Sequence, residues 1–259
     1  MTDFETLKFA ESGLMTSIVL DRPDAANGMN DTLTRELAEA AALCDTASTK
    51  VVTLTGAGKF FSAGGDLKAM AAASSAGAFV KGIADDLHRA LSTFARMDAI
   101  LITAVNGVAA GAGFPLGVSG DLVLAAESAS FTMAYTKVGL SPDGSSSYLL
   151  PRLIGLRKTQ ELMITNRVLS ATEAAQWGLV TTVVPDAELP AKMDELATRV
   201  ASGARHSHSA VKKLLLTTYG AGYEEQMELE ARLIAASASS ADGKEGIAAF
   251  LGKRKPEFP

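Results

Sequence analysis

The residue types that carry disulfide, redox and metal chemistry are scarce in this sequence of 259 residues. Its one cysteine, Cys44, cannot form an internal disulfide, so we expect a reducing, cytoplasmic compartment. Cys44 falls on the apolar face of an expected helix, which predicts an inert core residue. The three histidines do not stand at metal-ligand spacing with other ligands, and we expect no metal site.

Positive charge and long apolar runs are missing too. The chain has 24 Lys and Arg against 29 Asp and Glu, a formal net charge of -5, which argues against a nucleic-acid partner. No apolar run reaches the roughly 18 residues of a membrane span, so no membrane partner is expected. The G-x-S-x-G, Walker A and dinucleotide-binding fingerprints are also absent, which leaves no sign of the common hydrolase or nucleotide sites.

Two stretches rich in small residues are the most distinctive features of the chain. Residues 60–67 (FFSAGGDL) follow an expected buried strand at 51–55, and residues 106–114 (NGVAAGAGF) follow another at 100–105. Each stretch reads as a turn that leads towards a helix. Ordinary strand-to-helix connections would explain either turn alone. Together, two turns at strand ends can place two backbone N–H groups around one point, where they would stabilise an oxyanion.

Residues that form turns or cap helices mark the ends of several other expected elements. A hairpin is expected over residues 7–21, and Asn30 or Asp31 caps the helix that follows. A helix that starts near residue 146 is expected to break at Gly155 and then resume.

Hydrophobic periodicity places strands mainly in the first two thirds of the chain and helices in the last third. Apolar residues recur every three to four positions over residues 79–96, which predicts an amphipathic helix. Residues 69–77 are rich in Ala, Ser and Gly without such a face, and we expect a mobile segment there. We predict an α/β fold, with a core of strand-strand-helix units in residues 1–195 and a C-terminal helical region, residues 196–259, that could mediate assembly.

Asp143 is the acid that we favour as a catalytic base. It lies in Pro142-Asp143-Gly144, within a loop of Pro, Gly and hydroxyl residues, where a turn-forming or capping Asp is the alternative explanation. His88 lies on the expected helix over residues 79–96, and a lone histidine beside apolar residues is more often structural. The best chemical candidate is therefore the pair of turns with a nearby acid.

The sequence resembles the crotonase, or enoyl-CoA hydratase/isomerase, superfamily along nearly all of its length. The resemblance implies a spiral of ββα units with a C-terminal helical trimerisation region. It further implies a homotrimer or a hexamer built as a dimer of trimers, and an acyl-CoA thioester as substrate. Coenzyme A is then part of the substrate, and no separate cofactor is implied. The segments that carry the resemblance are residues 20–23, 61–67, 105–113, 174–184 and 253–258.

The resemblance also implies roles for particular residues. The thioester oxygen accepts hydrogen bonds from two backbone N–H groups, which by motif position are those of Gly65 and Ala112, although the family usually has Gly at the second place. Positions that line the path of CoA are matched by Ala25, Ala63, Asp66 and Leu67. Two C-terminal positions, which in some members reach the CoA of a neighbouring subunit, are matched by Phe250 and Lys253.

The departures from the family pattern bear on the reaction. Hydratases carry two glutamates that position and activate water, but this chain has Pro115 and Tyr135 at those places, and neither is a carboxylate. Isomerases of one branch, and the ring-opening isomerase of phenylacetyl-CoA degradation, carry an acid in the loop where Asp143 falls. We therefore predict an acyl-CoA isomerase that uses Asp143, Gly65 and Ala112, with His88, Pro115 and Tyr135 among the substrate-binding positions.

Three alternatives stay open. One is an enoyl-CoA hydratase-like enzyme of fatty-acid or aromatic-acid degradation. Another follows from residues 147–167, which also resemble 4-chlorobenzoyl-CoA dehalogenase. In that enzyme an Asp at the place of Asp143 is the nucleophile, and a His at the place of His88 helps to hydrolyse the aryl ester. The third is a crotonase-fold protein that binds acyl-CoA without catalysis.

Overall fold

The computed structural model describes residues 3–46 and 48–259. Its central element is a six-stranded sheet with the strand order β1-β2-β3-β5-β7-β10. Strands β1 and β2 form the expected antiparallel hairpin, and every other neighbouring pair is parallel. The strands are β1 (Leu7–Ser12), β2 (Met15–Leu20), β3 (Val51–Gly56), β5 (Ile100–Val105), β7 (Leu122–Ala126) and β10 (Thr182–Val184).

A second sheet of four short strands has the order β4-β6-β8-β9. Its members are β4 (Phe60–Ser62), β6 (Val108–Ala110), β8 (Ser130–Thr132) and β9 (Leu169–Ser170). The two stretches that we predicted as plain turns therefore contain strands, and that part of the prediction was wrong. Strands of three small residues have no periodicity of their own, and the parallel pairing of β6 with β4 and β8 defines them instead.

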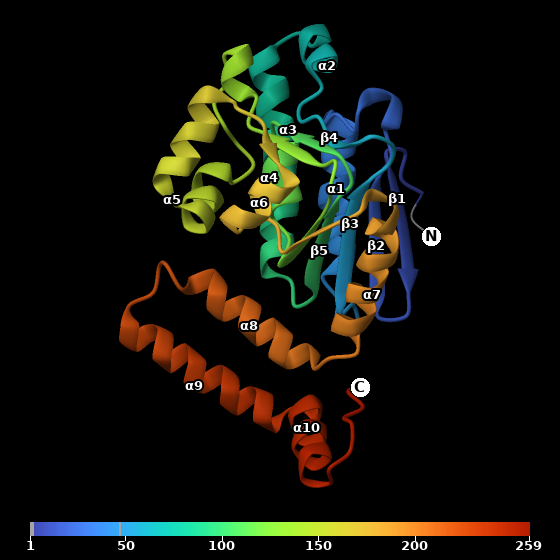
Figure 1. Cartoon of the computed structure of the whole chain (residues 1–259), viewed down its shortest axis with the longest axis vertical. Coiled ribbons are helices and arrows are strands. Elements are labelled where there is room, and N and C mark those ends of the chain that lie inside the picture. The colour runs from blue at the N-terminus through green and yellow to red at the C-terminus, as the bar shows by residue number, and fades with distance from the viewer. Residues whose placement is uncertain (1–2, 47) are drawn as a thin grey trace.

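Helices cover both faces of the large sheet (Figure 1). The helices concerned are α1 (Asp31–Cys44), α3 (Ala76–Arg96) and α7 (Leu189–Ala201). Side chains of β3 alternate between the faces, because Val52 and Leu54 join the core that includes α1, whereas Val51 packs with Ala197 and Ala201 of α7. Cys44 is fully buried in that larger core, and its burial raises the pKa of its thiol to about 12, as expected for an inert residue.

The segment over residues 69–77 is largely helical. It contains the end of α2 (Leu67–Ala72) and the start of α3, which are separated by three residues. Each helix has a side-chain cap, since Asp66 accepts backbone N–H bonds at the start of α2 and Ser75 accepts one at the start of α3. The mobility of the segment stays a prediction.

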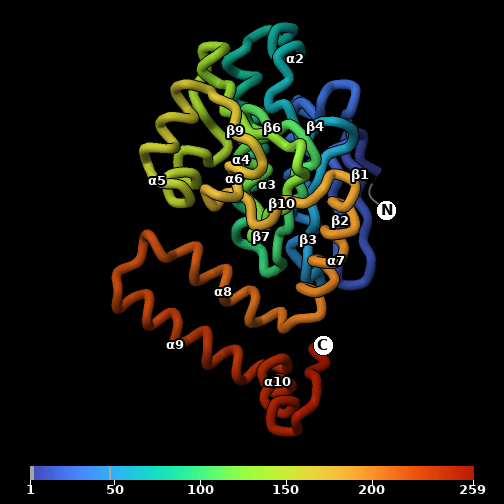
Figure 2. Tube along the Cα trace, viewed as in Figure 1, coloured from blue at the N-terminus to red at the C-terminus, as the bar shows by residue number. Residues whose placement is uncertain are grey.

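The chain ends in helices, as predicted. Two of them, α8 and α9, run side by side at one end of the molecule, and α10 follows (Figures 1 and 2). The predicted boundary at residue 195 falls inside α7. In the described part of the chain no helix is long and apolar enough to cross a membrane. The remaining helices are α4 (Gly113–Gly117), α5 (Ser146–Thr165), α6 (Ala171–Trp177), α8 (Arg205–Thr217), α9 (Tyr223–Ser239) and α10 (Ala241–Leu251), with 3-10 turns η1 (Pro23–Ala25), η2 (Tyr135–Val138) and η3 (Asp186–Glu188).

Candidate active site

The chain segments that follow β4 and β6 touch each other, and glycine is required at the contact. Gly64 has a left-handed backbone (φ +86°), and a Cβ there would lie 2.7 Å from the carbonyl oxygen of Ala110 and 3.0 Å from the nitrogen of Ala112. Gly111 is also left-handed (φ +51°). This close approach brings Gly65 and Ala112 to the wall of one pocket.

Two N–H groups at this contact have no hydrogen-bond acceptor among the residues that the structure describes. They are those of Gly65 and Ala112. The neighbouring N–H groups are used, since that of Asp66 donates to the carbonyl of Met29 (2.9 Å) and that of Gly111 donates to a carbonyl of β8 (3.1 Å). Two unpaired donors beside one pocket have the arrangement of an oxyanion hole.

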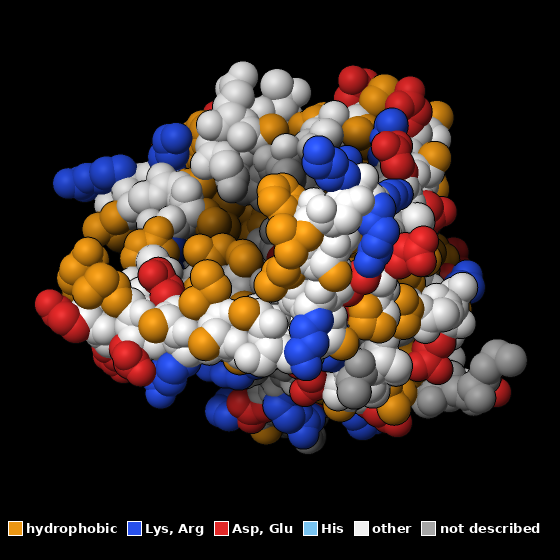
Figure 3. All heavy atoms as spheres, turned by 90° about the horizontal axis from the view of Figure 1, so that it is seen from below, with side chains coloured by type: hydrophobic (Ala, Val, Ile, Leu, Met, Phe, Trp, Pro, Cys, Tyr) orange, Lys and Arg blue, Asp and Glu red, His pale blue; other side chains and the backbone are white. Residues whose placement is uncertain are grey.

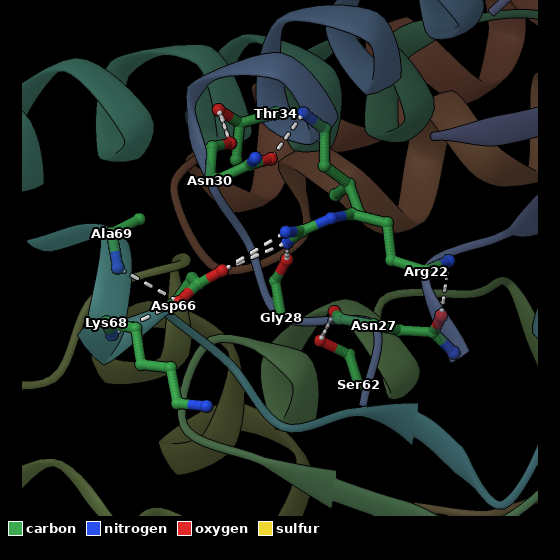
Figure 4. A network of polar contacts seen from close by, with 10 residues as sticks. Arg22, Asn27, Gly28, Asn30, Thr34, Ser62, Asp66, Lys68 and Ala69 are labelled. Carbon is green, nitrogen blue, oxygen red and sulfur yellow. Dashed lines mark hydrogen bonds and ion pairs between the residues drawn. The ribbon is translucent and has the colours of Figure 1, made fainter. Parts of the chain in front are cut away.

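A network of hydrogen bonds and an ion pair supports the segment that follows β4 (Figure 4). Asp66 Oδ1 accepts the N–H groups of Lys68 and Ala69 at 3.1 Å, and Oδ2 accepts both terminal nitrogens of Arg22 at 3.2 Å. Partial burial raises the pKa of the Asp66 carboxyl, but the bond from Ala69 and the Arg22 cation outweigh it and hold that pKa below its ordinary value. Both carboxylate oxygens of Asp66 thus accept hydrogen bonds from the protein itself.

Asn27 anchors the loop before α1, a role that sequence reasoning missed. Its buried amide nitrogen donates to the carbonyls of Ala57 (3.0 Å) and Phe60 (2.8 Å). The backbone carbonyl of Asn27 accepts a hydrogen bond from the hydroxyl of Ser62 at 2.8 Å (Figure 4). The only sequence signal was the Asn-Gly pair, which indicates a turn but not the buried bonds that tie this loop to β4.

Asp143 lines the same pocket and is hydrogen-bonded to a tyrosine. The hydroxyl of Tyr135 donates to Asp143 Oδ1 at 2.5 Å. Tyr135 is only 9 % exposed, and burial together with the Asp143 charge raises the pKa of its phenol far above the ordinary value. The phenol therefore stays protonated and is the donor in this bond.

Two further residues hold the Asp143 loop. The N–H of Gly144 donates to Nε2 of His88 at 3.1 Å. Gly144 is left-handed (φ +61°), and a Cβ there would lie 2.8 Å from Cγ of Pro115, which is buried beneath the loop. Pro115 and Tyr135, the residues at the two hydratase glutamate positions, thus both support the segment that carries Asp143.

This pocket is mainly apolar. It encloses about 760 Å³ of empty space, part of it open to solvent. The helical spacing of Phe79, Ile83 and Leu87 puts all three on the pocket side of α3. Its polar side chains are Thr34, Asp66, Tyr135 and Asp143. Such a wall with a few convergent polar groups suits an acyl group whose reacting end is polar.

The structure brings some of the predicted site residues together and leaves others apart. Those that line the pocket are Ala63, Gly65, Asp66, Leu67, Ala112, Tyr135 and Asp143. Ala25 lies in η1, outside the pocket lining. Phe250 is 84 % exposed at the end of α10, and Lys253 follows it. Their predicted contact involves a neighbouring subunit and stays a prediction. In residues 3–46 and 48–259 no cluster of three or more His, Cys, Asp or Glu could hold a metal ion.

Comparisons with known proteins place the chain in a family. A family model described as enoyl-CoA hydratase/isomerase matches residues 10–259. The chain is 36 % identical over 258 residues to 1,2-epoxyphenylacetyl-CoA isomerase of Escherichia coli (strain K12), with 97 % of each chain covered. It is 30 % identical over 260 residues to trans-2-decenoyl-[acyl-carrier-protein] isomerase of Streptococcus mutans, covering 99 % of this chain and 98 % of that one.

A solved structure extends the comparison to the fold. Enoyl-CoA hydratase from Bacillus anthracis superposes with a TM-score of 0.92 at 31 % identity, covering 98 % of this chain and 99 % of that one. The sequence identity of the chain to the two isomerases is thus similar to its identity to this hydratase. The chain belongs to the enoyl-CoA hydratase/isomerase family, within the crotonase superfamily, and has its α/β fold of ββα units.

Proposed function

We propose that this protein is an acyl-CoA isomerase that shifts the double bond of an enoyl-CoA thioester, with Asp143 as its base. The observation that carries the proposal is the difference in hydrogen bonding between two carboxylates. Among the described residues that line the pocket, only Asp66 and Asp143 carry a carboxylate. Asp66 caps α2 through Oδ1 and binds Arg22 through Oδ2, whereas one carboxylate oxygen of Asp143 has no donor among the residues that the structure describes. Asp143 is therefore the acid free to move a proton.

The proposed reaction needs the two N–H donors and one base. The thioester oxygen of a 3-enoyl-CoA accepts hydrogen bonds from Gly65 and Ala112, which stabilise the enolate as charge develops on it. Asp143 removes a proton from C2, the C2=C3 bond forms as the C3=C4 bond breaks, and the same proton returns to C4. Adding water would require further groups to position and activate it, and Pro115 and Tyr135 do not supply them.

Substrate and assembly are proposed on the same grounds. The substrate is an acyl-CoA thioester, with coenzyme A as part of it and no further cofactor. A homotrimer, or a dimer of trimers, is supported by the exposed apolar side chains of α8 to α10. Figure 3 views the molecule from the end where these helices lie and shows hydrophobic side chains exposed there in patches. The exposed apolar side chains of these helices are Val211, Leu215, Leu216, Tyr223, Met227, Ile234, Ile247, Phe250 and Leu251, and Tyr219 lies between α8 and α9.

The dehalogenase alternative is weakened by the position of His88. Its Nε2 already accepts the N–H of Gly144, so that lone pair is not available to activate water. The histidine instead supports the loop of Asp143.

A panel of thioesters tests the proposed reaction. Purified protein is incubated with 3-enoyl-, 2-enoyl-, 1,2-epoxyphenylacetyl- and 4-chlorobenzoyl-CoA. Chromatography with mass spectrometry then separates isomers of equal mass and detects added water. We expect conversion of 3-enoyl- to 2-enoyl-CoA without water addition or chloride release. Faster hydration of 2-enoyl-CoA would overturn the proposal, and binding of every thioester without turnover would favour the non-catalytic alternative.

A further inference from the structure

We propose that Tyr135 is a positioning residue for the base, fixing Asp143 Oδ1 so that Oδ2 alone takes the proton from the substrate and returns it. The inference rests on the proposed isomerase function and deepens it. Tyr135, which stands at a hydratase glutamate position, would then support proton transfer by another residue, Asp143.

The phenol is held where it can do this. The backbone N–H of Tyr135 donates to the carbonyl of Met133 (2.7 Å), and the N–H of Leu140 donates to the carbonyl of Tyr135 (3.0 Å). Ala134, just before it, has a left-handed backbone (φ 55°), which turns the chain into η2. The buried ring thus has hydrogen-bonded backbone on both sides, and its hydroxyl donates to Asp143 within the lining of the pocket.

The carboxylate itself has one partner. Among the described residues, only Tyr135 donates to it, through Oδ1. Among the described residues, the titratable groups that contact this loop are Tyr135 on η2 and His88 on α3, and Asp66 lines the same pocket. His88 binds the backbone of Gly144 and Asp66 is engaged with Arg22, so neither competes for Oδ2.

The bond from the Tyr135 phenol has a geometric consequence for the base. It limits rotation of the Asp143 carboxylate, which holds Oδ2 in line with C2 and C4 of the proposed substrate. Misplacement of a reacting group by about 1 Å can cost about 10²-fold in rate.

The test is Tyr135→Phe in the full chain, assayed with 3-enoyl-CoA. We expect kcat to fall by about 10- to 100-fold with little change in KM, because the base is misplaced while the binding surface is kept. Tyr148→Phe is the matched control, since Tyr148 is 51 % exposed and its hydroxyl has no hydrogen-bond partner among the described residues.

A second variant covers the case in which Tyr135→Phe unfolds, which a melting curve of each protein will reveal. Site-specific 3-fluorotyrosine at position 135 keeps the ring and makes the phenol a stronger donor, so kcat should change while KM stays close to that of the wild type. If Asp143→Asn is inactive but both Tyr135 variants keep the wild-type kcat, the positioning role is overturned and the isomerase proposal stands. If the wild type does not isomerise, or Asp143→Asn does so at full rate, both are overturned.

Discussion

Gly64 is the residue on which the placement of the two N–H donors depends. Its left-handed backbone and the 2.7 Å and 3.0 Å approaches to Ala110 and Ala112 leave no room for a Cβ. We predict that Gly64→Ala pushes the two segments apart and lowers kcat by about 10²–10³-fold, the usual effect of losing one oxyanion donor. Steady-state kinetics with 3-enoyl-CoA provide the measurement.

Gly13→Ala is the matched control for this prediction. Gly13 is also left-handed (φ +60°), but a Cβ there meets nothing within 4 Å. Its substitution should lower stability by about 1 kcal/mol through backbone strain and leave kcat unchanged. A Gly64→Ala enzyme with the wild-type rate would show that the close approach does not set the donors.

Sequence reasoning at the residue scale named three residues that the structure brings to one pocket, but not the residues that support them. Gly65 and Ala112 were chosen by motif position and Asp143 by its Pro-Asp-Gly loop as well, and their catalytic roles stay predictions. The bond between Tyr135 and Asp143 was not predicted. It depends on the left-handed turn at Ala134, and an alanine gives no sequence signal for such a backbone.

The capping of α2 by Asp66 provides a prediction at the scale of an element. Asp66→Ala removes the cap and the Arg22 ion pair, and we expect a loss of about 1–2 kcal/mol in the free energy of unfolding at pH 7. Asp66→Asn separates the two contributions, because the amide oxygen can still cap but carries no charge for Arg22. Urea unfolding of the three proteins measures both effects.

The same variants have a defined pH dependence. The pKa of Asp66 is lower in the folded protein than in the unfolded chain, so its charge stabilises the fold above the unfolded value of about 4. That contribution is lost as the pH falls through the folded-state pKa. The gap between wild type and Asp66→Asn should therefore be full at pH 7 and should narrow below about pH 4. A gap independent of pH would contradict the ion-pair role.

At the element scale, what could be predicted depended on length and periodicity. The long amphipathic helices α1 and α3 and the break of α5 at Gly155 followed from spacing and punctuation, and the structure has them, with Gly155 at φ 79°. The strands β4, β6 and β9 were missed. They have two or three residues each, and pairing with distant segments rather than local sequence defines them.

At the scale of the whole molecule, the exposed apolar side chains of the last helices predict self-assembly. Wild-type protein should sediment as a trimer or hexamer. Phe250→Asp places a charge on the apolar end of α10 and should shift the distribution towards smaller species, because a buried unpaired charge is costly. Leu14→Asp, at an exposed apolar position in the β1–β2 hairpin, is the control and should leave the size unchanged. A wild-type monomer at micromolar concentration would contradict the prediction.

The most direct measurement of the central claim is the rate at which Asp143→Asn converts 3-enoyl-CoA to 2-enoyl-CoA, compared with wild type. The amide keeps the shape of the side chain but cannot take the proton. We predict a fall in kcat of at least about 10³-fold, within the range that a positioned acid or base contributes, while binding of the CoA ester stays close to that of the wild type. Isomerisation at the full rate in Asp143→Asn would contradict the account.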